Sequence, residues 1–209
     1  MNKLYILILC LALTSCAVGR KVKYDNLKMN LSEIKTNDLS ISLLDHREAV
    51  IDGSRKPDFV GYMRSNVGIA YPIGTESKND FIFDLTSNLL NSFKRFNINV
   101  NSIDTKWSDS ESDIKSKLFL TNSNKKILII FDELHTDGYA IQVLHYKINF
   151  FIFDKNNELL KYKVFDADKK LGGTVAFGAG PYKKYMPEAM TKLFEEMFND
   201  QEILNAINK

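Results

Sequence analysis

Hydrophobic residues recur along the chain with two different periods, and each period predicts one type of secondary structure. Apolar residues spaced three or four positions apart indicate amphipathic helices. The first predicted helix is marked by Phe81, Ile82, Leu85, Leu89, Leu90, Phe93 and Phe96, and the second by Met190, Leu193, Phe194, Met197 and Phe198. Pro187 precedes the second set, at a position where a first helical turn tolerates proline.

Other segments alternate between apolar and polar residues or form short apolar runs, which predict strands. Lys126 to Phe131 is a continuous apolar run, typical of a central strand buried on both faces. Ile141 to Phe153 alternates, and the turn DKNNE joins it to a second alternating segment, Leu159 to Phe165. Shorter strands are expected at Ile41–Asp45 and Ile98–Ile103, and two glycine-containing, bulged or edge-like strands between residues 59 and 74.

Predicted strands outnumber predicted helices, and the longest pair of strands is a hairpin. This order favours an α+β fold, with a mainly antiparallel β-sheet and two amphipathic helices packed on one face. We expect Leu89 and Phe93 of the first helix to pack on the same sheet face as Leu144, Tyr146 and Ile148.

The N-terminus has the pattern of a secretory signal. Lys3 precedes an apolar run, Leu4 to Leu13, which is shorter than the ~20 residues that span a bilayer. The sequence Leu13-Thr14-Ser15-Cys16 then resembles a bacterial lipobox. The resemblance implies that residues 1–15 are removed and that a covalent lipid is attached to Cys16. Ala17 rather than aspartate after Cys16 implies the outer membrane, on its periplasmic face. An ordinary cleaved signal with a chance cysteine, or a short uncleaved anchor, remains an alternative.

Length and composition indicate one domain after this leader. We expect residues 16–38 to form a lipidated N-terminus and tether, and residues 39–209 a single globular domain. The only other cysteine, Cys10, lies within the signal, so the body has no disulfide. Lys and Arg number 28 against 26 Asp and Glu, and this balance argues against a nucleic-acid partner.

Three segments of the body carry a family resemblance. ISLLDHRE is an early strand that ends in Asp and Arg, GTESKNDFIFDLTSNLLNSFKRFNINV is a helix that runs into a strand, and YKINFFIFDKNNELLKYKVF is a hairpin. Together they resemble the YajG-like group of uncharacterised bacterial lipoproteins. The resemblance implies an outer-membrane lipoprotein with a helix-on-sheet body, and it implies no activity and no catalytic residues.

Candidate chemistry is confined to one short segment. In an extended chain, Glu133, His135 and Asp137 would share one face, with His145 across a hairpin, and this set could bind a metal. The alternative is a solvated polar edge. The glycines of 173–178 lack the Lys-Ser/Thr of a phosphate loop, and no nucleophile motif is present. We therefore expect no cofactor beyond the covalent lipid.

Two classes of function remain. The favoured one is a non-catalytic envelope protein, held at the membrane by its lipid, that binds a protein, lipid or glycan. The alternative is a metal-dependent or enzymatic envelope factor that uses Glu133, His135 and Asp137. Two segments are expected to recognise a partner: the charged stretch from Asp45 to Asp58, and the glycine-rich stretch from Gly172, which leads to Tyr182 and Tyr185.

The lipid attachment is testable by removing the thiol. We predict that Cys16→Ser leaves a protein that is uncleaved or unanchored, because serine cannot form the thioether. Metabolic labelling with a fatty-acid analogue should reach the wild-type protein and not the variant. Equal labelling of both proteins would contradict the lipobox assignment.

Overall fold

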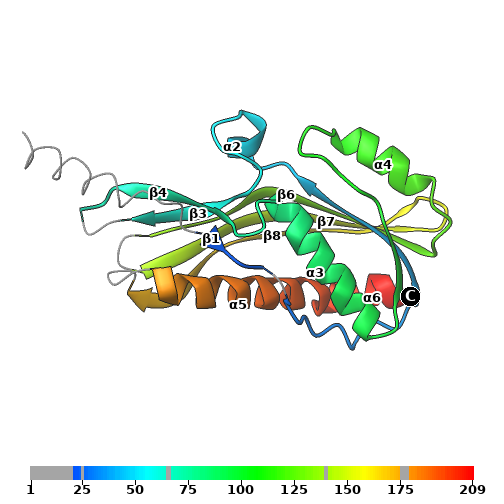
Figure 1. Cartoon of the computed structure of the whole chain (residues 1–209). Helices are drawn as coiled ribbons and strands as arrows, with labels where there is room; N and C mark the ends of the chain where they lie inside the picture. Colours follow the sequence, from blue (N-terminus) through cyan, green and yellow to red (C-terminus); the bar gives the residue numbers. More distant parts are fainter. Residues whose placement is uncertain (1–20, 25, 65–66, 139–140, 175–178) are drawn as a thin grey trace, which may run out of the picture.

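The computed structural model of the chain describes residues 21–209, apart from 25, 65–66, 139–140 and 175–178. A curled sheet forms the centre of the molecule, with helices against it (Figure 1). The strands are β1 (Lys21–Val22), β2 (Asp38–Asp45), β3 (Phe59–Arg64), β4 (Ala70–Thr75), β5 (Asn99–Ser102), β6 (Lys125–Asp137), β7 (Ile141–Asp154) and β8 (Leu159–Thr174). The helices are α2 (Glu48–Ile51), α3 (Phe81–Arg95), α4 (Glu111–Phe119), α5 (Ala179–Phe198) and α6 (Gln201–Asn208).

The sheet is mixed, so the prediction of a mainly antiparallel sheet is wrong. Its eight strands include the path β1-β4-β3-β6-β2-β5, and β7 joins the other side of β6 and carries β8. β2 runs parallel to both β5 and β6, β1 runs parallel to β4, and β3 is parallel to β6 where they meet. The reason lies in the connections: α3 precedes β5 and α4 precedes β6, and a helical crossover returns the chain to the start of a parallel strand.

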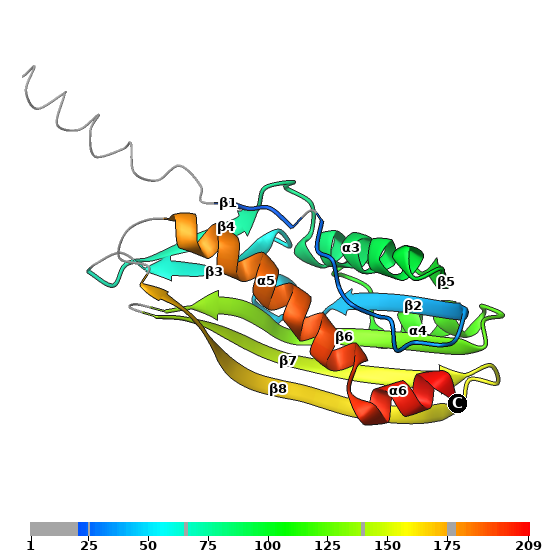
Figure 2. The ribbon, with the colours of Figure 1, turned by 90° about the horizontal axis from the view of Figure 1, so that it is seen from below.

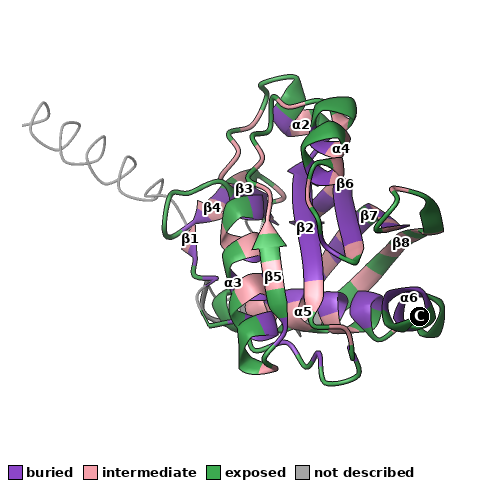
Figure 3. Cartoon of the chain, turned by 90° about the vertical axis from the view of Figure 1, so that its right-hand side faces the viewer, coloured by how far each residue is buried: buried purple, intermediate pink, exposed green. Residues whose placement is uncertain are grey.

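The helices lie on both faces of the sheet, so the prediction of helices on one face only is wrong. The main core joins α3, α5 and α6 to one face (Figure 2). A second, smaller core lies on the other face, where Ile114 and Leu118 of α4 pack with Leu128 and Ile130 of β6. The second core follows from the apolar run of β6, which is buried on both faces as predicted and needs cover on each (Figure 3).

The predicted packing of α3 is confirmed. Leu89 and Phe93 belong to the same core as Leu144, Tyr146 and Ile148 of β7. The ring of Phe93 also meets Phe198 of α5 edge-on, with 5.5 Å between the ring centroids. α5 is longer than its apolar pattern indicated. It begins at Ala179, so Pro187 lies inside the helix rather than in its first turn.

The segment that we expected to be a tether packs against the core from Lys21 onward. Tyr24, Leu27 and Met29 are buried with the main core. Two polar side chains of α3 bind the backbone of this N-terminal segment. Asn88 Oδ1 accepts a hydrogen bond from Leu27 N at 2.9 Å, and Ser92 Oγ accepts one from Met29 N at 3.3 Å. Buried polar groups need such partners, which explains why two polar residues lie on the inner side of an otherwise apolar helix.

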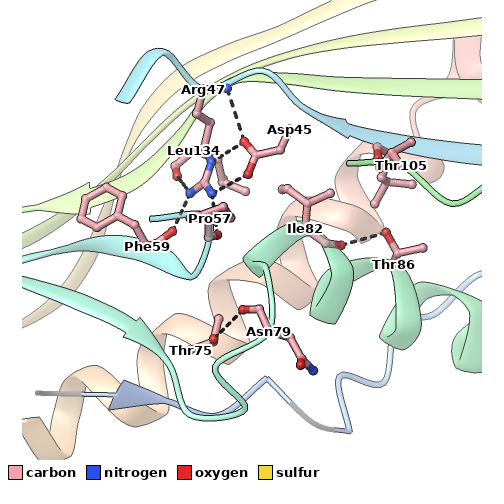
Figure 4. Close-up of polar contacts among 11 residues, drawn as sticks. Asp45, Arg47, Pro57, Phe59, Thr75, Asn79, Ile82, Thr86, Thr105 and Leu134 are labelled. Carbon is pink, nitrogen blue, oxygen red and sulfur yellow. Dashed lines mark hydrogen bonds and ion pairs between the residues drawn. The ribbon is translucent and has the colours of Figure 1, made fainter. Parts of the chain in front are cut away.

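A fork in the sheet is filled by one arginine. β6 pairs with β2 as far as Asp45↔Phe131, then bulges, and meets β3 at Gly61↔Thr136. Arg47 enters the gap between β2, whose pairing with β6 ends here, and β3, whose pairing with β6 begins further along (Figure 4). Its Nε and Nη2 each donate to a carboxylate oxygen of Asp45 at 2.7 Å. Its guanidinium also donates to the carbonyl oxygens of Phe59, Leu134 and Pro57.

The fork ion pair is buried, with Asp45 3% and Arg47 4% exposed. The run of charged residues from Asp45 to Glu48 predicts a charged loop, and this prediction is wrong for Asp45 and Arg47, which are buried. A planar guanidinium with five donors suits a place where strands part, because it can satisfy several backbone carbonyls and a carboxylate at once.

In the described part of the chain, no helix is both long and apolar enough to cross a membrane.

The fork makes a prediction about stability. We expect Arg47→Met to lower the free energy of unfolding by about 3–5 kcal/mol, because it leaves Asp45 buried without its counter-charge. Urea unfolding followed by circular dichroism measures the change. The matched control is Arg64→Met, which removes a similar two-pronged pair with Asp137 from a partly exposed position. The control should change stability little. Equal effects of the two substitutions would show that the fork does not depend on Arg47.

Candidate functional site

Two neighbouring parallel strands send their connections to opposite faces of the sheet. The chain that leaves β2 returns to β5 through α3, on the side of the main core, whereas the chain that leaves β5 returns to β6 through α4, on the other side. β2 and β5 are paired in parallel. Such a reversal opens a crevice beyond the carboxyl ends of the two strands, and this is where open sheets with helical crossovers bind ligands.

A groove of about 760 Å³ lies at this point. The ends of β2 and β5 contribute Asp45 and Ser102 to it. One wall is formed by α3 and the residues just before it: Lys78, Asn79, Asp80, Ile82, Phe83, Thr86, Ser87 and Leu90. The other wall is formed by the segment that leads to α4, with one residue of α4 itself: Ile103, Asp104, Thr105, Lys106, Trp107, Asp109 and Lys117. The groove therefore borders the fork that Arg47 holds together.

Two aromatic side chains of the groove are open to solvent. Phe83 is 59% exposed and Trp107 is 41% exposed. Phe81, Ile82 and Leu85 of the same helix face the core, so Phe83 extends the apolar surface of α3 beyond what the fold requires. Exposed aromatic side chains in a concave site are the usual anchors of a binding surface.

Hydrogen bonds hold both walls in place. Ile103 N donates to Ile41 O at 2.9 Å, Ser42 Oγ donates to Ile103 O at 3.3 Å, and Thr105 Oγ1 donates to Leu43 O. On the other wall, Thr75 Oγ1 donates to Asn79 O at 2.8 Å (Figure 4). The backbone of both walls is thus tied to strands, which fixes the walls of the groove.

Charges of both signs surround the aromatic pair. Lys78, Lys106 and Lys117 stand against Asp80, Asp104 and Asp109. A hydrogen bond from Lys106 N lowers the pKa of Asp109, whose carboxylate also meets Lys117 Nζ at 3.3 Å. Burial raises the pKa of Asp80, and the neighbouring carboxylates of Asp45 and Asp58 raise it further. The charged form of Asp80 is thus less favourable than that of a fully solvated aspartate, although Arg47 offsets part of this effect, and a cationic or hydrogen-bonding partner would favour it.

The candidate metal residues come together only in part, since His135 Nδ1 lies 3.5 Å from Glu133 Oε1 but Asp137 is bound elsewhere. Asp137 is occupied by Arg64, whose Nε and Nη2 donate to its two oxygens at 2.7 and 2.5 Å. His135 instead faces His145 across the β6–β7 pair, with ring centroids 5.0 Å apart, and His145 Nδ1 lies 2.7 Å from Asp168. Burial lowers the pKa of His135. Among the described residues, no group of three or more His, Cys, Asp or Glu side chains is arranged to hold a metal ion.

The other candidate residues lie apart from the groove. Tyr182 and Tyr185 belong to helix α5 rather than to a loop, and Tyr185 is half-buried. Cys16 and the side chain of Tyr182 lie outside the described residues. Of the stretch from Asp45 to Asp58, Asp45 and Arg47 are buried in the fork, and residues 48–51 form α2.

Sequence reasoning missed the aromatic pair of the groove. The available signal was Phe83 itself, the third of three consecutive apolar residues, which falls outside the apolar stripe of its helix. Trp107 gave no such signal, because it stands in a polar segment. Only the topology of the sheet brings the two residues to one groove.

Comparison with known proteins shows a shared fold. No protein-family model and no curated protein matches the chain. Protein XCC0632 from Xanthomonas campestris, of the family DUF330, is similar with a TM-score of 0.54 and 12% identity, over 90% of this chain and 94% of that one. PelC from Paraburkholderia phytofirmans, solved as a dodecamer, has a TM-score of 0.42 and 10% identity, over 83% and 88%. Lipoprotein GNA1162 from Neisseria meningitidis has a TM-score of 0.29 and 9% identity, over 75% and 97%. The likeness to the Xanthomonas protein shows that the two chains have the same fold.

Proposed function

We propose that this protein is a lipid-anchored bacterial envelope protein that binds a segment of a partner protein in the groove between α3 and residues 103–109. The groove at the crossover point, with Phe83 and Trp107 exposed on its walls, is the observation that carries the proposal. The anchor rests on Leu13-Thr14-Ser15-Cys16. Ala17 after the cysteine supports the outer membrane, on its periplasmic face.

The chemistry of the groove favours binding over catalysis. Its lining residues include no histidine and no cysteine, so it offers neither a neutral general base nor a thiolate nucleophile. The hydroxyl groups of Thr86 and Thr105 donate to backbone carbonyls, of Ile82 and Leu43 respectively. These hydroxyls serve the local structure and are not activated for attack.

The balance of charges favours a polypeptide as the occupant. Three lysines and three aspartates, together with Asp45 at the fork, give the groove no excess of positive charge. A phosphate-bearing lipid or a nucleic acid would call for such an excess. A peptide segment with an apolar anchor between polar side chains matches two exposed aromatic rings within a rim of mixed charge.

Site-specific cross-linking in intact envelopes tests this proposal. We predict that p-benzoylphenylalanine in place of Phe83 gives a discrete protein adduct on illumination, because the substituted ring is exposed on a wall of the groove. Immunoblotting detects the adduct as a band of higher mass, and mass spectrometry identifies the partner.

The control carries the same photoreactive residue at Leu120, which is 84% exposed and lies outside the groove. Leu120 should give no discrete adduct. Trp107 is the only tryptophan of the chain, so its emission reports on the groove alone. A synthetic peptide from the cross-linked partner should change that emission. If Phe83 gives no adduct, or the same adducts as Leu120, the groove is not the binding site.

A further inference from the structure

The anchor and the folded body are joined by a very short link. β1 begins at Lys21, so residues 17–20 alone separate it from Cys16. An extended chain advances at most ~3.6 Å per residue, which places the Cα atom of Cys16 within about 18 Å of that of Lys21. A lipid on Cys16 therefore holds the body directly against the bilayer rather than at the end of a long tether.

The position of β1 determines which end of the body is held there. β1 pairs in parallel with β4, with Lys21 opposite Gly74. β4 begins at Ala70, directly after the turn that joins it to β3. The chain enters β1 from the same side, and Lys21 lies five positions after Cys16, just as Gly74 lies five positions after Ile69. A fully extended link therefore reaches at most about as far as the level of Ile69, before the start of β4.

Exposed aliphatic side chains gather at this end of the sheet. Val67 is 79% exposed and Ile69 is 55% exposed in the β3–β4 turn, and Ile141, at the start of β7, is 46% exposed. Figures 1 and 2 show the start of β4, the start of β7, the end of β8 and the start of α5 together at one end of the molecule. The ion pair between Arg64 of β3 and Asp137 of β6 fixes the ends of these two strands relative to each other.

Positive charge accompanies these apolar side chains. Lys183 and Lys184 are exposed near the start of α5, and Lys21 lies at the start of β1. Apolar tips beside lysines are the combination that binds a lipid surface, since the apolar groups enter the acyl boundary and the lysines meet anionic headgroups. Side chains of the body at the bilayer surface would add a second contact to the covalent anchor.

We propose that this end of the body is a membrane-contact surface, in which Val67, Ile69 and Ile141 enter the interface of the bilayer that carries the anchor. The proposal rests on the lipid anchor of the proposed function. The opposite end cannot serve in the same way. β7 alone has 14 residues, a length of about 45 Å, which sets Leu120 and Leu159 well beyond the reach of residues 17–20.

Single labels on the body test the proposal. With Cys16 blocked as a thioether and Cys10 removed, an introduced cysteine is the only thiol. We predict that Val67→Cys and Ile141→Cys, labelled with the dye NBD in the full lipidated protein, show blue-shifted emission and quenching by spin-labelled lipid. These are the signs of an insertion of about 5–10 Å. The membranes are vesicles of phosphatidylethanolamine with a minority of phosphatidylglycerol.

Leu120→Cys is the matched control, since its side chain is also exposed and aliphatic but follows directly on α4, which ends at the opposite end of the molecule. Its label should keep the emission of an aqueous dye and resist quenching. Emission at residue 67 as aqueous as at residue 120, in protein that floats with the vesicles, would overturn the membrane-contact surface. Failure of the anchor looks different: the parent protein would take up dye at Cys16 and would not float.

Discussion

The structure depends on how one sheet changes partners along its central strand. β6 is paired with β2 over its first half and with β3 near its end, so on this side the backbone of β6 between the two pairings has no neighbouring strand, while β7 pairs with its other side throughout. Unpaired buried carbonyl groups are costly, and so is a buried charge. Arg47 and Asp45 solve both problems together, because the guanidinium satisfies the carbonyls while the carboxylate balances its charge. The desolvation of the pair is thus offset by five hydrogen bonds from one side chain.

The same ion pair positions the groove. The guanidinium lies 5.4 Å from the ring centroid of Phe81, the first residue of α3, and Phe81 N donates to Pro57 O at 2.9 Å. Asp45 is both the end of β2 and part of the groove lining. The start of α3 and the end of β2 are therefore held by shared contacts, which fix the two parts of the groove lining relative to each other.

The sequence predicts the elements of this fold better than their arrangement. The stripe from Phe81 to Phe93 and the alternation of β7 are local patterns, and both elements appear where these patterns indicated. Strand direction is not a local property, since an apolar run such as that of β6 has the same pattern in parallel and antiparallel sheets. Arg47 illustrates the same limit: beside His46 and Glu48 it reads as a charged surface, and only the fork of the sheet buries it. The groove could not be predicted for the same reason, because Phe83 and Trp107 come to line one groove only through the crossovers that follow β2 and β5.

With the proposed lipid on Cys16, the short link to β1 constrains what the groove can meet. From Asp45, opposite Phe131, to the β6–β7 turn after Asp137 is a rise of six residues along β6. At ~3.3 Å per residue, the groove begins about 20 Å from the proposed membrane-contact surface. A groove at that distance lies within reach of partners held at the same bilayer. Partners anchored in the same membrane would then meet the groove in two dimensions, where tethering raises their effective concentration. A moderate affinity for the peptide segment is sufficient under that constraint. This agrees with an open groove that offers two exposed aromatic side chains as anchors.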